Sequence, residues 1–185
     1  VSDESLIKTA LKQTPNVAVR NAEGGFDGPD TDEFVQNNPI GLAMIKKNEN
    51  EKTNIRANTF AEATLIDGLT FKTELSFDYG ITKIYRFDPS YKFGAITNEV
   101  REGQQSKSYN RFWTWRNVIN YNRTFGVHNV NTMLGHEMQK SSWEYLYGYR
   151  SGYLTNGATD LTLGDANTAR NDGNSGANSL LSFFG

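Results

Sequence analysis

Residues 69–86 alternate between two kinds of side chain over a long stretch, and this pattern constrains the fold more than any other feature of the chain. Successive side chains of a β-strand point to opposite faces, so an extended stretch of this kind has one apolar face and one polar face. Strands of ordinary domains have about five or six residues. The length therefore favours a tilted strand of an outer-membrane barrel, which meets lipid on one face and water on the other. The apolar parity contains Leu69, Phe71, Leu75, Phe77 and Tyr79, and the polar parity contains Lys72, Glu74, Ser76 and Asp78.

The composition is compatible with this interpretation. The chain is 37% hydrophobic with a mean hydropathy of −0.62, and it has no apolar run of the roughly 18 residues that a membrane helix needs. Only alternate residues of a barrel strand meet lipid, so a low hydropathy does not exclude a barrel. The net charge of −2 gives no basic surface for nucleic acid. The absence of cysteine excludes disulfides and thiolate metal sites.

The same alternation recurs along the chain and predicts an all-β, antiparallel meander of long amphipathic strands. A short helix is predicted at 5–12, ended by Pro15. Asp67-Gly68 and Gly126-Val127 are predicted as tight turns. Short turns at one end and long loops at the other are typical of outer-membrane barrels. The predicted strands are 51–66, 69–87, 107–125, 128–145 and 179–185, with long loops at 88–106 and 146–178.

Aromatic residues of the 107–125 stretch are spaced to match a membrane. Trp115 and Phe125 share one parity and lie ten residues apart, which corresponds to roughly 23 Å along the membrane normal at a tilt of about 45°. The apolar band of a barrel is about 25 Å tall and is bordered by aromatic residues. A soluble β-sandwich also buries aromatic residues at alternate positions. What covers the apolar parity therefore decides between the two folds.

Metal binding and catalysis have little support. Asp27, Asp30, Asp32 and Glu33 could ligate calcium, but their spacing is not that of an EF-hand loop, and a solvated acidic loop at 27–33 is the preferred interpretation. No phosphate-binding loop, zinc motif or nucleophile motif is present. We therefore expect no catalytic residue, no metal and no cofactor.

Two groups of side chains are candidates for contact with a substrate or partner. The first is the set of charged residues on the polar parity, which we expect to line the lumen because barrel interiors are polar: Arg56, Glu62, Glu74, Asp78, Arg116 and Glu137. The second is an aromatic cluster near the end of a predicted strand, since aromatic faces stack on sugars, peptides and cations. It consists of Trp143, Tyr145, Tyr147, Tyr149 and Tyr153, for which packing in an upper aromatic girdle is the alternative.

A series of short motifs is spread over residues 5–150 and 179–185. These stretches are Asn38-Pro39-Ile40, Asn58-Thr59-Phe60-Ala61-Glu62, Ile66-Asp67-Gly68-Leu69-Thr70-Phe71-Lys72-Thr73, Phe87-Asp88-Pro89-Ser90-Tyr91, Trp113-Thr114-Trp115-Arg116-Asn117, Leu134-Gly135-His136-Glu137 and Ser179-Leu180-Leu181-Ser182-Phe183-Phe184-Gly185. Each motif is short, but their order and spacing along the chain are specific. Together they resemble a known family, the SusC/RagA class of TonB-dependent outer-membrane transporters of Bacteroidota.

The resemblance implies a fragment of a barrel of about 22 strands, several times longer than this chain. Residues 1–50 would be a helix and an extracellular-type loop segment leading into the barrel, residues 51–185 would be about five strands with their loops, and the plug domain would be absent. The implied function is uptake of oligosaccharide or peptide across the outer membrane. The implied partners are a SusD-like surface lipoprotein, outer-membrane lipid, and TonB through parts outside this chain. A soluble β-rich carbohydrate-binding or adhesin module is the alternative.

Overall fold

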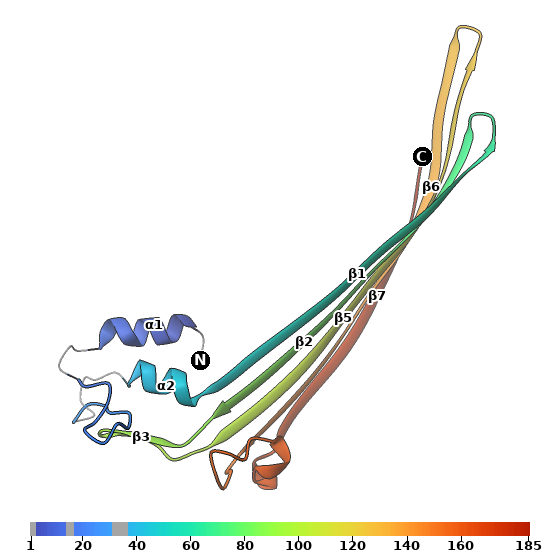
Figure 1. The fold of residues 1–185 in the computed structure, drawn as a ribbon. Coiled ribbons are helices and arrows are strands. Elements are labelled where there is room, and N and C mark those ends of the chain that lie inside the picture. Colours follow the sequence, from blue (N-terminus) through green and yellow to red (C-terminus); the bar gives the residue numbers. More distant parts are fainter. Residues whose placement is uncertain (1–2, 14–16, 31–36) are drawn as a thin grey trace. The chain divides into compact units, whose positions relative to one another are not determined.

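The structure, a computed structural model, describes residues 3–13, 17–30 and 37–185 (Figure 1). The described residues form two compact units. The loop unit comprises those of residues 1–50, 83–106 and 147–172, and the strand unit comprises residues 51–82, 107–146 and 173–185. Pro15, Asp32 and Glu33 lie outside the described residues, so the predictions made for them are not addressed.

Five long strands form one antiparallel sheet in the order β1-β2-β5-β6-β7, which confirms the predicted fold class. Each long strand therefore lies next to the long strand that precedes it in the sequence, as a meander requires. The bounds are β1 Lys47–Ile66, β2 Leu69–Asp88, β5 Glu102–Phe125, β6 His128–Ser151 and β7 Arg170–Phe184.

Both predicted tight turns join long strands within the strand unit. Gly68 and Gly126 have positive φ angles of 81° and 62°, a conformation that glycine adopts without steric cost. The carbonyl of Gly68 also accepts a hydrogen bond of 2.8 Å from the backbone nitrogen of Asn122, in β5. A Cβ atom at position 68 would lie 2.5 Å from the carbonyl oxygen of Asn122, so both the φ angle and the space require glycine there.

The two segments predicted as long loops are shorter than expected. Segment 88–106 contains a small hairpin, β3 Tyr91–Phe93 with β4 Ile96–Asn98, and β5 already begins at Glu102. Segment 146–178 is strand up to Ser151 and again from Arg170, so its loop is 152–169. The composition of 170–178 suggested a loop because it is rich in glycine and asparagine. Pairing with β6 overrides this composition, and the missing side chain of Gly176 leaves room for the indole of Trp143, 2.9 Å from the place of a Cβ.

Two helices precede the strands. The predicted helix is present as α1 Asp3–Lys12. A second helix, α2 Pro39–Ile45, was not predicted. Its signal is Asn38-Pro39, because the Asn38 side chain caps the helix by accepting from the Gly41 nitrogen at 2.8 Å and proline suits the first helical position. The Asn38 amide also donates to the carbonyls of Val19 at 2.8 Å and Asp27 at 2.7 Å.

The hydrophobic core of the described residues lies entirely in the loop unit. Phe87, Phe93 and Tyr153 are the buried hydrophobic residues there. Phe87 and Tyr153 meet edge to face with ring centroids 5.2 Å apart, and Phe93 stacks on Tyr91 at 4.7 Å. Gly94, with φ 57°, allows the β3–β4 hairpin to approach the backbone of Pro29, whose oxygen would lie 2.4 Å from a Cβ at that position.

The strand unit has no comparable core. Leu75 is 48% exposed, Trp115 42% and Ile119 43%, and no second sheet covers them within the part of the chain that the structure describes. A soluble β-sandwich would bury these side chains. Among the described residues, no helix combines the length and the apolar character needed to pass through a bilayer.

Candidate functional site

The polar parity of β1 and β2 forms a cross-strand network in the strand unit. Arg56 donates from Nε to Oδ2 of Asp78 at 2.6 Å. The Asn58 amide donates to Glu74 at 3.0 Å and to Ser76 at 2.7 Å. Such cross-strand contacts require side chains that stand on the same face of the sheet. Three of the predicted lumen residues, Arg56, Glu74 and Asp78, therefore share one face.

Strands β5 and β6 extend this polar face. Arg116 donates from Nε to Oε2 of Glu137 at 2.6 Å, and Gln139 donates to the other carboxylate oxygen of Glu137. Glu62, the sixth predicted lumen residue, is exposed on β1 and has the parity of Arg56. The Arg56 side chain is 80% exposed, so its ion pair contributes only about 0–1 kcal/mol to stability. These side chains therefore add little to the stability of the sheet, but they can present alternating charges and amides to a ligand.

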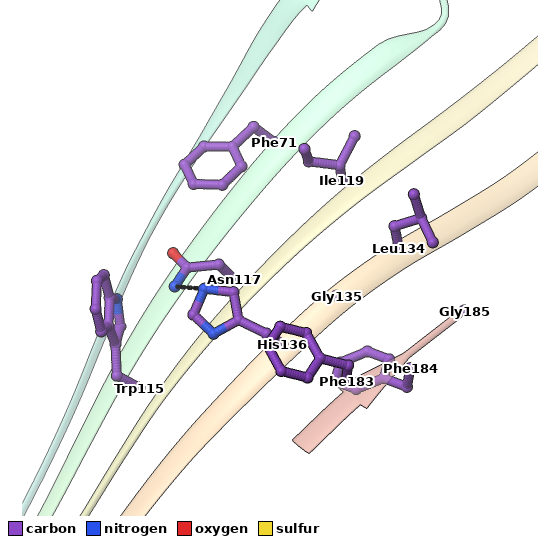
Figure 2. Close-up of a pocket in the computed structure, with 10 residues that line it drawn as sticks. All are labelled: Phe71, Trp115, Asn117, Ile119, Leu134, Gly135, His136, Phe183, Phe184 and Gly185. Carbon is purple, nitrogen blue, oxygen red and sulfur yellow. Dashed lines mark hydrogen bonds between the residues drawn. The ribbon is translucent and has the colours of Figure 1, made fainter. Parts of the chain in front are cut away.

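The apolar parity forms the opposite face and contains a hollow of about 830 Å³ (Figure 2). Its lining is mostly apolar and comes from β2, β5, β6 and β7: Phe71, Trp115, Ile119, Leu134, His136, Phe183 and their neighbours. Figure 2 shows Asn117 and His136 pointing toward one another, with the Asn117 amide 3.1 Å from Nε2 of the imidazole. The Trp115 indole meets the His136 ring edge to face at 5.8 Å and donates to Thr73 at 3.0 Å. Sequence reasoning placed Phe71, Trp115 and Ile119 on the apolar parity, did not assign Leu134, His136 or Phe183 to it, and did not find the hollow.

The predicted aromatic cluster is divided between the two units. Trp143, 43% exposed, and Tyr145 belong to the strand unit, while Tyr147, Tyr149 and Tyr153 belong to the loop unit. Tyr147 donates to Gln104 at 3.1 Å, and the guanidinium of Arg170 lies 5.3 Å from the ring centroid of Tyr149. Their role in substrate or partner binding stays a prediction.

Tyr153 differs from the other members of the cluster because it is only 2% exposed. Strand β6 ends at Ser151, and Gly152 has a φ of 74°, which interrupts the alternation and turns Tyr153 toward Phe87. Its hydroxyl has no hydrogen-bond partner among the described residues, and burial raises the pKa of this phenol. Tyr153 is placed to support the loops, and its ring is not available for stacking on a ligand.

A network of side chain to backbone hydrogen bonds holds the loops of the loop unit together. The Asn156 oxygen accepts from the Ser90 nitrogen and from Arg101, both at 2.9 Å, and its amide donates to the Ser90 carbonyl at 2.9 Å. Tyr85 donates to the carbonyl of Thr159 at 3.0 Å. Asparagine commonly bonds loop backbone in this way, but a sequence does not reveal which distant loop it meets.

The acidic loop gives no sign of a metal site among the residues described. The side chain of Asp27 accepts from the neighbouring Gly28 nitrogen at 2.8 Å, as in a turn. No group of three or more potential ligands occurs within the described ranges. Because Asp32 and Glu33 are outside those ranges, calcium binding at 27–33 stays untested.

Comparison with known proteins links this fold to a class of receptor. No protein-family model matches the chain. TonB-dependent receptor P3 of Formosa agariphila is 29% identical over 191 residues, which cover 97% of this chain and 18% of that receptor. TonB-dependent receptor P39 of the same organism is 25% identical over 146 residues, covering 78% of this chain and 14% of the receptor. The chain thus spans less than a fifth of the length of these relatives.

Solved structures share the fold. A structure of the RagAB peptide transporter matches with a TM-score of 0.74 and 17% identity. The "open-open" and "closed-closed" states of the RagAB peptide importer each match with a TM-score of 0.76 and 18% identity. All three matches cover 88% of this chain and 18% of the solved chain.

These findings bear on three predictions made from the sequence. The similar proteins are receptors and transporters by name, which agrees with the prediction that the chain is not an enzyme. The similarity to TonB-dependent receptors agrees with the predicted location in the outer membrane. In sequence this chain is similar to a segment of two TonB-dependent receptors, and in fold it matches a portion of the chains in the RagAB structures, as the resemblance of its motifs implied.

Proposed function

We propose that this segment forms part of the wall of an outer-membrane nutrient importer, with the apolar parity toward lipid and the polar parity toward the lumen. One observation carries the proposal: the strand unit separates its side chains into a face of hydrogen-bonded charges and amides and a face of large, exposed apolar residues. A barrel wall between lipid and water needs this separation.

Peptides are the substrate class that we propose first. The similar solved structures are of a peptide importer, and the Arg56–Asp78 and Arg116–Glu137 pairs offer both donors and acceptors that suit peptide groups. Oligosaccharides are the second candidate, because the half-exposed Trp143 offers an aromatic ring on which a sugar could stack.

The loops of the loop unit are proposed to face the outside of the cell, where a SusD-like lipoprotein would dock. TonB would supply energy from the periplasm through parts of the receptor outside this chain. Loops held on a rigid scaffold commonly carry recognition. In loop 152–169, Leu154 is 89% exposed and Leu163 is 53% exposed, so both side chains are available to a partner.

The test uses the full-length parent receptor with residues 155–168 replaced by a four-residue Gly/Ser linker, which leaves β6 and β7 intact. We expect weaker lipoprotein docking or substrate uptake, while the heat-dependent gel mobility of a folded barrel is retained. A point variant, Leu154→Asp, should reduce docking without removing the bonds of Asn156. The matched control is Val127→Asp, at a residue 95% exposed in the Gly126-Val127 turn, which should change neither activity. Normal docking and uptake in both loop variants would contradict the proposed role of this loop.

A further inference from the structure

A second hollow, of about 420 Å³, lies on the polar parity of the strand unit, midway along β1, β2 and β5. It shares no lining residue with the apolar hollow of Figure 2. Three strands contribute side chains to it, and the cross-strand bonds between β1 and β2 hold two of its walls in place. The lining includes Arg56, Asn58, Ser76, Asp78 and Phe112.

Phe112 gives this polar hollow an apolar wall. It is four residues from Arg116 on β5, so its side chain belongs to the polar face on which Arg116 meets Glu137. The ring is 40% exposed. An aromatic ring exposed among charges and amides gains free energy when an apolar group of a ligand covers it. The hollow therefore suits a ligand that has an apolar part.

Arg56 supplies a pair of hydrogen-bond donors to the same hollow. Its Nε donates to Oδ2 of Asp78 at 2.6 Å, and this bond does not use the two Nη groups of the guanidinium. The side chain is 80% exposed, so the Nη groups are accessible to a ligand. A carboxylate can accept two parallel hydrogen bonds from a guanidinium, whereas a primary amide offers only one oxygen. Because the ion pair has no net charge, recognition depends on these two bonds rather than on long-range attraction.

The amide of Asn58 adds an acceptor beside Arg56. Its Nδ2 group donates to Glu74 at 3.0 Å and to Ser76 at 2.7 Å, and both bonds cross from β1 to β2 and fix the amide. The Asn58 carbonyl oxygen is then the part of this amide that can accept from a peptide N–H. The last residue of a peptide carries a carboxylate, a side chain and an N–H group together, which are the three groups that this hollow can bind.

We propose that the hollow binds the C-terminal residue of a peptide, with its carboxylate on the Nη groups of Arg56, an apolar side chain against Phe112 and its N–H toward Asn58. This inference rests on the proposed function, because it requires the polar parity to face the lumen of a peptide importer. The hollow then selects peptides that have a free carboxylate and an apolar last residue. Neutral oligosaccharides lack the carboxylate and are not ligands of this hollow.

The experiment offers pools of short synthetic peptides of mixed sequence to the full-length parent receptor and quantifies the bound peptides by mass spectrometry. One pool ends in leucine with a free carboxylate, the second is its C-terminal amide, and the third ends in glycine with a free carboxylate. We expect about tenfold enrichment of the free acids over the amides, because charge-assisted bonds are lost in the amide. We expect about fivefold enrichment of leucine over glycine, because the open hollow buries the leucine side chain only in part.

Two substitutions should separate these preferences. Arg56→Gln should remove the preference for the free acid and keep the preference for leucine, whereas Phe112→Ala should do the reverse and Phe112→Leu should restore most of the preference for leucine. The matched controls are Lys72→Gln and Phe60→Ala. Lys72 lies 4.9 Å from the ring centroid of Phe60 on the same polar face, and neither residue lines the hollow, so both preferences should stay unchanged.

The comparison of the three pools on the unaltered receptor tests the site even if a variant does not fold. Equal binding of acids and amides, or a preference for acids that Arg56→Gln leaves intact, would overturn the site while leaving the importer proposal in place. A loss of preference in the controls equal to that in Arg56→Gln and Phe112→Ala would also overturn it. Binding of no peptide pool would instead contradict peptides as the substrate class, and the site with it.

Discussion

A pair of arginine substitutions at adjacent residues of β2 tests which face of the sheet meets lipid. Leu75 belongs to the apolar parity and is 48% exposed. It is four residues from Tyr79 and six from Leu69, so it lies roughly 9 Å and 14 Å along the membrane normal from the two ends of this apolar run. Leu75 is therefore near the middle of the band, where arginine on the lipid face costs about 2–4 kcal/mol of folding free energy.

Ser76 is the matched position because it follows Leu75 directly in the sequence and its side chain points to the opposite face of the sheet. Its hydroxyl accepts a hydrogen bond of 2.7 Å from Asn58, and loss of that bond costs about 0.5–1.5 kcal/mol. An arginine at position 76 would enter a face that already holds Arg56 and Asp78. We therefore expect Leu75→Arg to be more destabilising than Ser76→Arg by about 1–3 kcal/mol.

The assay is denaturant-dependent folding of the full-length parent into lipid vesicles, which gives the free energy of unfolding for each variant. Correct insertion is checked by protection of the strands from protease. Equal losses for Leu75→Arg and Ser76→Arg, or a larger loss for Ser76→Arg, would refute the assignment of the two parities to lipid and lumen.

Two further predictions concern the loop unit. Gly103→Ala places a methyl group 2.3 Å from the hydroxyl of the buried Tyr153 and should destabilise the loops by about 1–3 kcal/mol. This loss is measured as faster proteolysis of residues 152–169. The control is Gly157→Ala, which should be neutral because the nearest atom to its methyl group is 3.9 Å away. Because burial raises the pKa of Tyr153, its contribution to loop stability is complete below the unfolded pKa near 10 and is lost as pH rises through the higher folded value. Tyr153→Phe, which removes an unpaired hydroxyl, should abolish this alkaline sensitivity of proteolysis, and retention of the sensitivity would exclude Tyr153 as its source.

The sheet could be predicted from the sequence because alternation is a local property with a fixed period. Leu75 and Ser76 were assigned to opposite faces from parity alone, and the hydrogen bonds of Ser76 and Glu74 to Asn58 agree with that assignment. The turns could also be predicted, since Gly68 and Gly126 supply the positive φ angles that hairpins need.

The limits of the strands could not be predicted in the same way. Residues 170–178 have little intrinsic preference for a strand, and they are extended because β6 pairs with them. Tyr153 shows the opposite effect, since one glycine before it ends the alternation and moves the ring from the expected surface into the core. Contacts such as Asn156 with Ser90 join residues 66 positions apart, a relation that no local pattern encodes.

The loop unit takes its shape from side chain to backbone bonds made by Asn38 and Asn156 and from three buried aromatic residues, rather than from its outward side chains. Outward positions such as Leu154 can therefore change their chemistry while the loop conformation persists. Under the proposed function, a receptor built in this way can change the chemistry of its exposed loop residues, and therefore what it binds, without a matching change in its strands.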